Sequence, residues 1–353
     1  MSNFGLPSEK LKEARSKLPP IKLSSFIDPR EPWVLVPDGN LLGFFHWVPK
    51  NLRVGPWSHL AIPTLTLAAS ILVYYRPNNN FDDYYLHADN YYPQLYSNIW
   101  WYNVLGFLFM LGNLTYIMLY RTKGAILTYT LISWVMNTMR HGINAITPCL
   151  MKQQAVDDVD NTPLLLKQLL KINHILRFPA IASASITFVV WNAVLFPLIY
   201  NYGFDTKEKK TNFLKFNCAF RMVQQHVCNI IYAVMNTIVS VSENNTGSNN
   251  SAPVLFQSDD LWRGATSIFL YGIFYLVILD RIGVHIYPIF SPRTNYVIIT
   301  WCTVFLLIIG VYHFWNWVMI NYWDSLLRLD MLMTLNLGIV MSMSVVNKVI
   351  ISN

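Results

Sequence analysis

Residues 98–120, NIWWYNVLGFLFMLGNLTYIMLY, decide the fold class of this chain. The stretch contains no charged side chain, and Trp and Tyr residues stand near its two ends. A helix of about 20 largely apolar residues crosses the hydrocarbon core of a bilayer, and Trp and Tyr favour the two interfaces. These residues are therefore predicted to form a transmembrane helix.

Similar windows recur along the 353 residues, of which 54% are hydrophobic. Charged residues make up 13% of the chain, against about 25% in soluble domains. The clear windows are residues 57–75, 98–120, 124–146, 178–200, 214–241, 264–288 and 296–323. Residues 330–350 form a softer window, either a weak span or an interfacial helix. The sequence thus predicts an all-α, polytopic transmembrane helix bundle of about seven helices, or eight if the last window also spans.

The chain divides into a polar basic N-terminal arm (1–56), a transmembrane bundle (57–325) and a C-terminal segment (326–353). The arm lacks the apolar core of a secretory signal peptide, so the first span is expected to direct its own insertion. Within the arm, residues 7–18 are expected to form a charged surface helix that ends before Pro19.

Basic residues predict the orientation. The net charge is +7. In a membrane protein such an excess usually reflects basic cytosolic loops and attraction to anionic lipid, so nucleic acid is not an expected partner. The segments 121–123 and 207–215 are expected to face the cytosol with the N-terminus. The loops 76–97 and 242–262 then lie on the opposite side, where 242–262 carries two Asn-x-Ser/Thr sequons. The basic residues 164–177 fall on that side against the rule. We expect an integral protein of the endoplasmic reticulum membrane.

The four cysteines lie in or beside apolar windows without paired spacing: Cys149, Cys218, Cys228 and Cys302. They are predicted to be small core residues rather than a disulfide frame or a metal site. No cofactor and no bound metal are expected.

The third window carries a polar stripe. At spacings of three and four it holds Thr130, Ser133, Asn137, Arg140 and Asn144. Polar side chains at bilayer depth are costly unless they are paired or face a cavity, so the stripe is predicted to face inward. Thr128 lies about 160° away from it at ~100° per residue. By itself, a lone Thr in a transmembrane helix usually bonds its own i−4 carbonyl.

His226 is the strongest histidine candidate, because it lies mid-window among polar side chains, including Gln224, Gln225 and Asn229. Asn229 shares its helix face at i+3 and can orient the ring. Since Gln224 and Gln225 point elsewhere, the helix is polar on more than one side. We therefore expect it to lie inside the bundle.

Several segments resemble the androgen-induced family of multispan membrane proteins, whose members hydrolyse fatty acid esters of hydroxy fatty acids with a membrane-embedded Thr and His. Leu127-Thr128-Tyr129 is similar to the setting of the family's Thr, and His226 in MVQQHVCNIIYAV to that of its His. Three further segments resemble later or intervening family helices: ITFVVWNAVLFPLIY, Val284-His285-Ile286-Tyr287-Pro288 and Ile320-Asn321-Tyr322-Trp323-Asp324. The resemblance covers about residues 98–325.

The chain departs from the family in several places. Leu131 stands where the family has an acidic residue three positions after its Thr, and Val223 stands where it has a second His. The first span, a longer loop before the fifth family helix and the C-terminal segment are additions. These departures leave the activity and the substrate open.

The resemblance implies an intramembrane lipid-ester hydrolase in which Thr128 is the nucleophile and His226 is the base. Gln225, Asn229 and Asn137 are then candidates for stabilising the oxyanion. Thr128 and His226 both follow basic loops predicted to be cytosolic, so they fall in the same half of the membrane and can meet. The expected partner is a membrane lipid or fatty acid ester, and the oligomeric state stays open.

Two other functions fit the residues. A transporter or a lipid-binding membrane scaffold would use the polar stripe as a path or a headgroup site. A haem-binding transmembrane cytochrome would draw axial ligands from His141, His226, His285 and His313.

Overall fold

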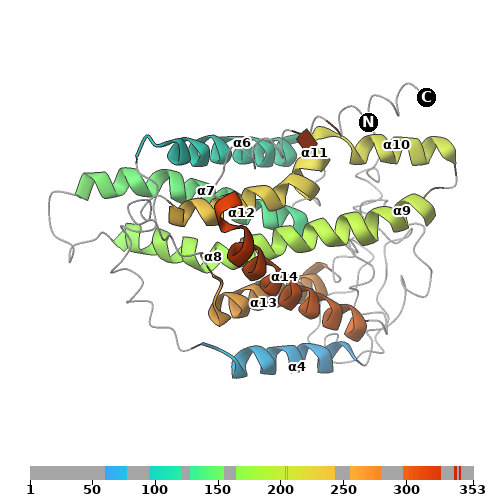
Figure 1. Ribbon diagram of the computed structural model, residues 1–353. Coiled ribbons are helices and arrows are strands. Elements are labelled where there is room, and N and C mark those ends of the chain that lie inside the picture. Colours follow the sequence, from blue (N-terminus) through green and yellow to red (C-terminus); the bar gives the residue numbers. More distant parts are fainter. Residues whose placement is uncertain are drawn as a thin grey trace.

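The computed structural model describes residues 60–77, 95–120, 128–154, 164–202, 204, 206–242, 255–279, 297–326, 338–339 and 342. Every regular element in these ranges is a helix, and the helices pack into one bundle (Figure 1). The predicted all-α fold class is therefore confirmed. The arm 1–56 and most of the window 330–350 lie outside the described residues.

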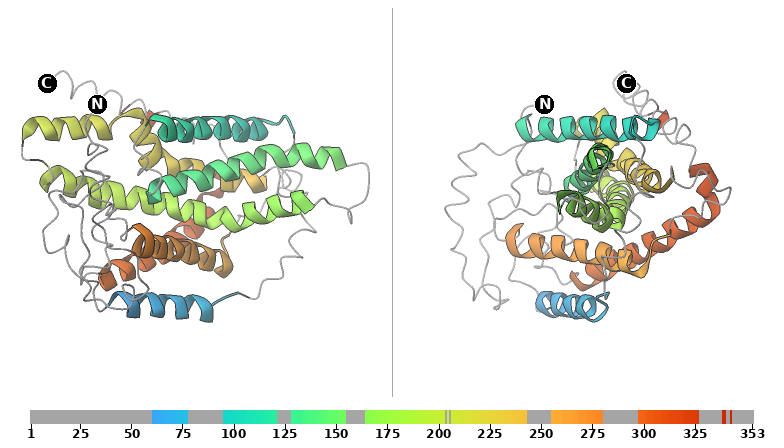
Figure 2. Two further views of the ribbon diagram at one scale, coloured as in Figure 1. Left: turned by 180° about the vertical axis from the view of Figure 1, so that it is seen from behind. Right: turned by 90° about the vertical axis from the view of Figure 1, so that its left-hand side faces the viewer.

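Two helices form the centre of the bundle, α7 (Tyr129–Gln154) and α8 (Leu164–Val189), which pack side by side in all views (Figure 2). On one side they carry α6 (Asn98–Tyr120), which packs against α7. The helix α12 (Asn229–Ser242) packs against both central helices. The polar stripe of α7 therefore faces protein rather than lipid.

Glycines allow α6 and α7 to approach each other closely. A Cβ built on Gly142 would lie 2.9 Å from the ring of Phe107, and one on Gly106 would lie 3.0 Å from Nδ1 of His141. Small residues at such contacts let helix backbones pack tightly where lipid supplies no hydrophobic driving force. This contact fixes His141 at the seam of the two helices.

The other side of the central pair is covered by α13 (Ser258–Ile273), α14 (Val297–Leu326) and α4 (Ala61–Tyr74), the outermost helix in Figure 1. The largest apolar cluster lies mainly among α8, α12, α13 and α14. A hydrogen bond also links α14 to α8, since Nε1 of Trp315 donates to Oγ of Ser185 at 3.0 Å.

The described residues contain three stretches of π-helix. After α8 the chain continues through η4 (Val190–Leu195) into α9 (Phe196–Tyr202). In the same way η5 (Gln224–Cys228) joins the short α11 (Phe220–Val223) to α12. The third stretch, η7 (Phe274–Leu279), follows α13. Such turns are rare and often occur at functional sites.

The window 214–241 is broken rather than continuous. The helix α10 (Lys207–Asn217) starts at the cap Thr206, whose Oγ1 accepts from Lys209 N at 3.3 Å. Ala219 is extended, with φ −65° and ψ 139°, so the helix that carries His226 begins at Phe220.

Three helices in the described ranges are long and apolar enough to cross a membrane: Asn98–Leu119, Leu164–Asn201 and Ile298–Tyr322. A shorter apolar helix covers Ala61–Tyr74. These findings support an integral membrane protein, while the number of seven spans stays a prediction. The helix α7 has 26 residues, which is long enough to span, but it is less apolar than these three helices. One of its faces is polar, and neighbouring helices cover that face.

Residues 164–177 are the first turns of α8 rather than a separate basic connection. The apolar helix Leu164–Asn201 has 38 residues. At ~1.5 Å per residue it is longer than the hydrocarbon core of about 30 Å, so part of it extends into the polar region. Its basic N-terminal turns suit that position.

The cysteine prediction is right for two residues and wrong for two. All four thiols are free, with Cys218 and Cys228 buried and Cys149 and Cys302 exposed. An apolar thiol on a helix face that meets lipid costs little, so such a residue need not be in the core.

Candidate active site

Thr128 is the N-terminal cap of α7. Its Oγ1 accepts a hydrogen bond from Leu131 N at 3.2 Å, and its carbonyl oxygen accepts from Ile132 N at 3.2 Å. The expected helix start at residue 124 is corrected, because α7 begins at Tyr129. A helix N-terminus stabilises negative charge on a nearby oxygen. The half-buried Thr128 hydroxyl therefore lies at the positive end of the α7 dipole.

His226 lies in η5 and is 8% exposed, which confirms that its helix lies inside the bundle. Its ring stacks on Trp191 of η4, with centroids 4.2 Å apart and planes inclined by 20°. Nδ1 of His226 is buried and has no hydrogen-bond partner among the described residues. The stack on Trp191 fixes the plane of the imidazole.

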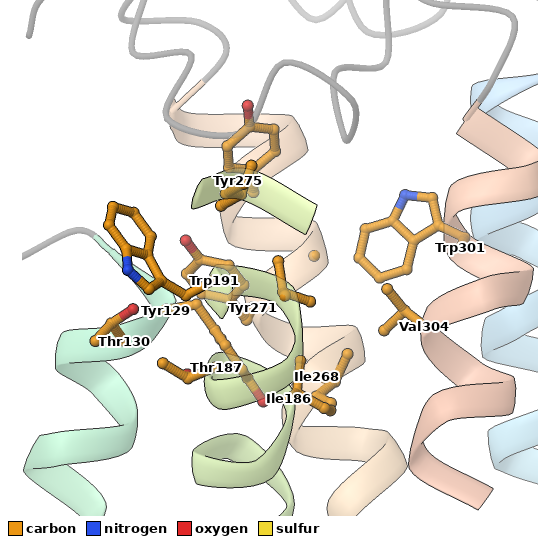
Figure 3. A pocket seen from close by; sticks show the side chains of 13 residues that line it. Tyr129, Thr130, Ile186, Thr187, Trp191, Ile268, Tyr271, Tyr275, Trp301 and Val304 are labelled. Carbon is orange, nitrogen blue, oxygen red and sulfur yellow. The ribbon is translucent and has the colours of Figure 1, made fainter. Parts of the chain in front are cut away.

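A cavity of ≈ 60 Å³ lies between the start of α7, the end of α8 with η4, and the helices α13 and α14 (Figure 3). Tyr129 and Thr130, which follow Thr128, line it, and so does Trp191, which stacks on His226. Thr128 and His226 themselves are not among the residues that line the cavity, so each is linked to it only through a neighbour.

The lining of this cavity is largely apolar and aromatic, with Ile186, Ile268 and Val304 among its walls. Thr187 adds a polar atom, since its Oγ1 is buried without a hydrogen-bond partner in the part of the chain that the structure describes. Such a cavity suits an acyl group with one or two polar atoms.

The three supporting residues separate in the structure. Nδ2 of Asn137 donates to Oδ1 of Asn229 at 2.8 Å, and Nδ2 of Asn229 donates to Oγ of Ser133 at 2.9 Å. The structure therefore brings Asn137 and Asn229 together, but their amide groups hold α7 to α12. By contrast, Nε2 of Gln225 is buried with no hydrogen-bond acceptor among the described residues. Gln225 is the candidate oxyanion donor that remains.

The polar stripe is buried, as predicted, with Arg140 only 1% exposed. Its Nε donates to Oδ1 of Asn173 at 3.0 Å and its Nη1 donates to Oγ1 of Thr237 at 2.8 Å. Nδ2 of Asn144 donates to Oδ1 of Asn236 at 2.6 Å. Side chains from α7, α8 and α12 are thus joined by several hydrogen bonds, which indicates a structural network, although Oδ1 of Asn137 is buried without a partner among the described residues.

A second buried polar cluster joins α8 to α13. Asp260 pairs with Arg177 and, at 3.4 Å, with Arg263. Nη1 of Arg263 also lies 2.9 Å from Nε2 of His174. This cluster anchors the N-terminus of α13, where Asp260 belongs to the capping box of the helix.

Like His226, the described histidines His141 and His313 do not line the cavity. Nδ1 of His141 lies 3.0 Å from Oδ1 of Asn103, and His313 is exposed on α14. His285 lies outside the described residues. Within the described ranges no group of three or more His, Cys, Asp or Glu side chains could hold a metal ion.

Sequence reasoning missed Trp191 and the π-helical turns. Trp191 lies in the middle of an apolar stretch, and its indole Nε1 donates to Oδ1 of Asn217 at 2.7 Å. The stacking of Trp191 on His226 joins residues that are 35 positions apart and lie on two different π-turns. No local sequence pattern predicts this contact. The remaining signal in the sequence was Asn192, a polar residue directly after Trp191 in an apolar stretch.

Comparisons of the chain with models of protein families, with curated proteins and with solved structures gave no match.

Proposed function

We propose that this protein is an intramembrane hydrolase of lipid esters, in which Thr128 is the nucleophile and His226 is the base. The observation that carries the proposal is a cavity that is lined by neighbours of both residues, although not by Thr128 or His226 themselves. Tyr129 and Thr130, adjacent to Thr128, line one part of it, and Trp191, stacked on His226, lines another. The resemblance of these segments to the androgen-induced family adds support.

In the first half-reaction, Oγ1 of Thr128 attacks the carbonyl carbon of the ester while His226 takes the hydroxyl proton. The tetrahedral intermediate collapses and the C–O bond to the alcohol breaks. The departing alkoxide receives the proton from His226. The product is an ester between the acyl group and Thr128.

In the second half-reaction, a water molecule attacks the acyl carbon and gives a proton to His226. The bond to Oγ1 of Thr128 breaks, and Oγ1 regains the proton. The products are a carboxylic acid and the free enzyme. Each half-reaction therefore returns His226 to its neutral state.

Both tetrahedral intermediates carry a negative oxygen. We assign its stabilisation to Nε2 of Gln225, which has no acceptor among the described residues. The N-terminus of α7 adds to this effect, because Thr128 is the cap of that helix.

The proposed substrates are esters of membrane lipids or of hydroxy fatty acids, which reach the cavity from the bilayer. We also propose that the protein resides in the endoplasmic reticulum membrane with a cytosolic N-terminus. The basic segments that precede Thr128 and His226 support this orientation.

A lipid-binding scaffold is the second candidate. The apolar and aromatic lining of the cavity favours it, because such a lining binds an acyl chain without any reaction. The two functions differ in whether a covalent adduct forms at Thr128.

Labelling with a fluorophosphonate probe, followed by peptide mass spectrometry, tests the proposal. The wild-type protein in nanodiscs is expected to carry the probe on Thr128. Thr128→Asn should abolish labelling while preserving the cap, since Asn caps helices as well as Thr does. His226→Phe should abolish labelling while keeping a ring against Trp191.

Thr303→Ala and His313→Ala are the matched controls, because both residues are exposed on α14. They should label like the wild type. A wild-type protein that takes no probe, or Thr128→Asn that labels equally well, rules out the hydrolase and leaves the scaffold.

A further inference from the structure

The wall of the cavity opposite Trp191 is built from α13 and α14, where Trp301 packs on Gly272 (Figure 3). A Cβ built on Gly272 would lie 1.9 Å from Cη2 of Trp301 and 2.6 Å from Cζ2. The indole therefore occupies the space that any side chain at position 272 would need. Only a glycine there lets Trp301 reach the backbone of α13.

Trp301 is held firmly in this position. It is 5% exposed, although it stands on a helix with many lipid-facing residues. Val304, about one turn further along α14, lines the same wall and is 7% exposed. The wall is thus a packed surface rather than a mobile side chain over an opening.

The space in front of this wall is small. The cavity measures ≈ 60 Å³. An apolar protein cavity of about 150 Å³ holds a benzene molecule. The space between Thr130, Trp191 and the Trp301 indole is therefore smaller than a cavity that holds benzene.

We propose that Trp301 limits the length of the acyl group and that the substrates are lipid esters of short acids, from acetyl to butyryl. This inference rests on the proposed hydrolase function and names its substrate class. The enzyme should discriminate against acyl groups that are too long, because one misplaced methylene in a hydrophobic pocket changes kcat/KM by roughly tenfold or more.

Hydrolysis of p-nitrophenyl acetate, butyrate and octanoate by the purified full chain in nanodiscs tests this inference. The wild type should favour butyrate over octanoate by at least about 100-fold. Trp301→Ala should raise the octanoate to butyrate ratio of kcat/KM by about tenfold or more. Trp317→Ala, an exposed tryptophan on the same helix, should leave the ratio unchanged.

A second variant covers the case in which Trp301→Ala does not fold. Val304→Leu adds bulk to the same wall and narrows the cavity, so it should lower the rate of butyrate hydrolysis relative to the rate of acetate hydrolysis. If the wild type hydrolyses these esters but the profile stays the same in the folded Trp301 and Val304 variants, the length limit is refuted while the hydrolase stands. If no ester is hydrolysed and no probe labels Thr128, both proposals fall.

Discussion

Two regions of buried polar groups differ in how fully they are hydrogen-bonded: the groups between α7 and α12, most of which have partners although Oδ1 of Asn137 has none among the described residues, and the groups of η5 and the end of α8. In the first region, Arg140 and Asn144 bind side chains of neighbouring helices. In the second, Nδ1 of His226, Nε2 of Gln225 and Oγ1 of Thr187 have no hydrogen-bond partner in the described part of the chain. A buried polar atom without a partner costs about 1–3 kcal/mol, so its presence calls for another explanation.

The comparison teaches where to look for chemistry in a helical membrane bundle. The polar stripe is the more conspicuous feature of the sequence, but its side chains hold the helices together. In η5 and at the end of α8, Nδ1 of His226, Nε2 of Gln225 and Oγ1 of Thr187 have no hydrogen-bond partner among the described residues. Each variant below tests one side of this contrast.

The largest effect is expected for His226→Phe. The variant keeps a flat ring next to Trp191 but removes the base, so kcat for p-nitrophenyl butyrate should fall by about 10³-fold, or roughly 4 kcal/mol. The midpoint of thermal unfolding should stay close to that of the wild type. A variant with wild-type turnover would remove His226 from the mechanism.

Gln225→Leu tests the proposed oxyanion donor. Loss of one such donor typically lowers kcat by about 10²-fold, or roughly 2.7 kcal/mol, with little change in KM. Steady-state kinetics measure the two parameters separately. Asn137→Leu should change stability rather than kcat, because the Asn137 amide binds Asn229. The reverse result would exchange the roles of Gln225 and Asn137.

Arg140→Met tests the network. The variant leaves Asn173 and Thr237 without their charged donor, and the free energy of unfolding should fall by about 2 kcal/mol. Denaturant titration in detergent measures the change. Adding Asn173→Leu should recover part of the loss, since it removes an acceptor left without a donor. If Arg140→Met proves as stable as the wild type, the network is not what holds α7 to its neighbours.

The smallest effects distinguish Thr187→Val from Ser183→Ala. Thr187 has an unpartnered hydroxyl, so replacing it by a methyl group should leave the unfolding free energy unchanged or raise it by up to about 1 kcal/mol. Ser183 donates to Ser133 at 3.1 Å, and its loss should cost about 1 kcal/mol. Equal effects in both variants would show that Thr187 has a partner in the membrane.

Apolar runs and polar spacing predict much of this bundle. The uninterrupted window 98–120 is the helix α6, and the three-and-four spacing from Ser133 to Asn144 correctly places that face inward. Such patterns reflect burial along a single helix, which the sequence records directly.

Features that depend on several helices were missed. The break at Ala219 occurs within an apolar stretch that shows no Pro or Gly signal. The cap at Thr128 was missed because the apolar window extends upstream of it. The stack of Trp191 on His226 requires two π-turns to face each other, and no local propensity encodes that contact.

The π-turn at Gln224–Cys228 has a consequence for the register of the helix that follows it. A π-turn accommodates one more residue than the same length of α-helix. If the same residues formed a regular α-helix, everything on one side of this turn would be rotated by about 100° relative to the other. His226 could then face Trp191, or Asn229 could face Asn137, but both contacts could not persist. The one additional residue in the π-turn thus allows His226 to face Trp191 while Asn229 faces Asn137, which a regular helix could not do.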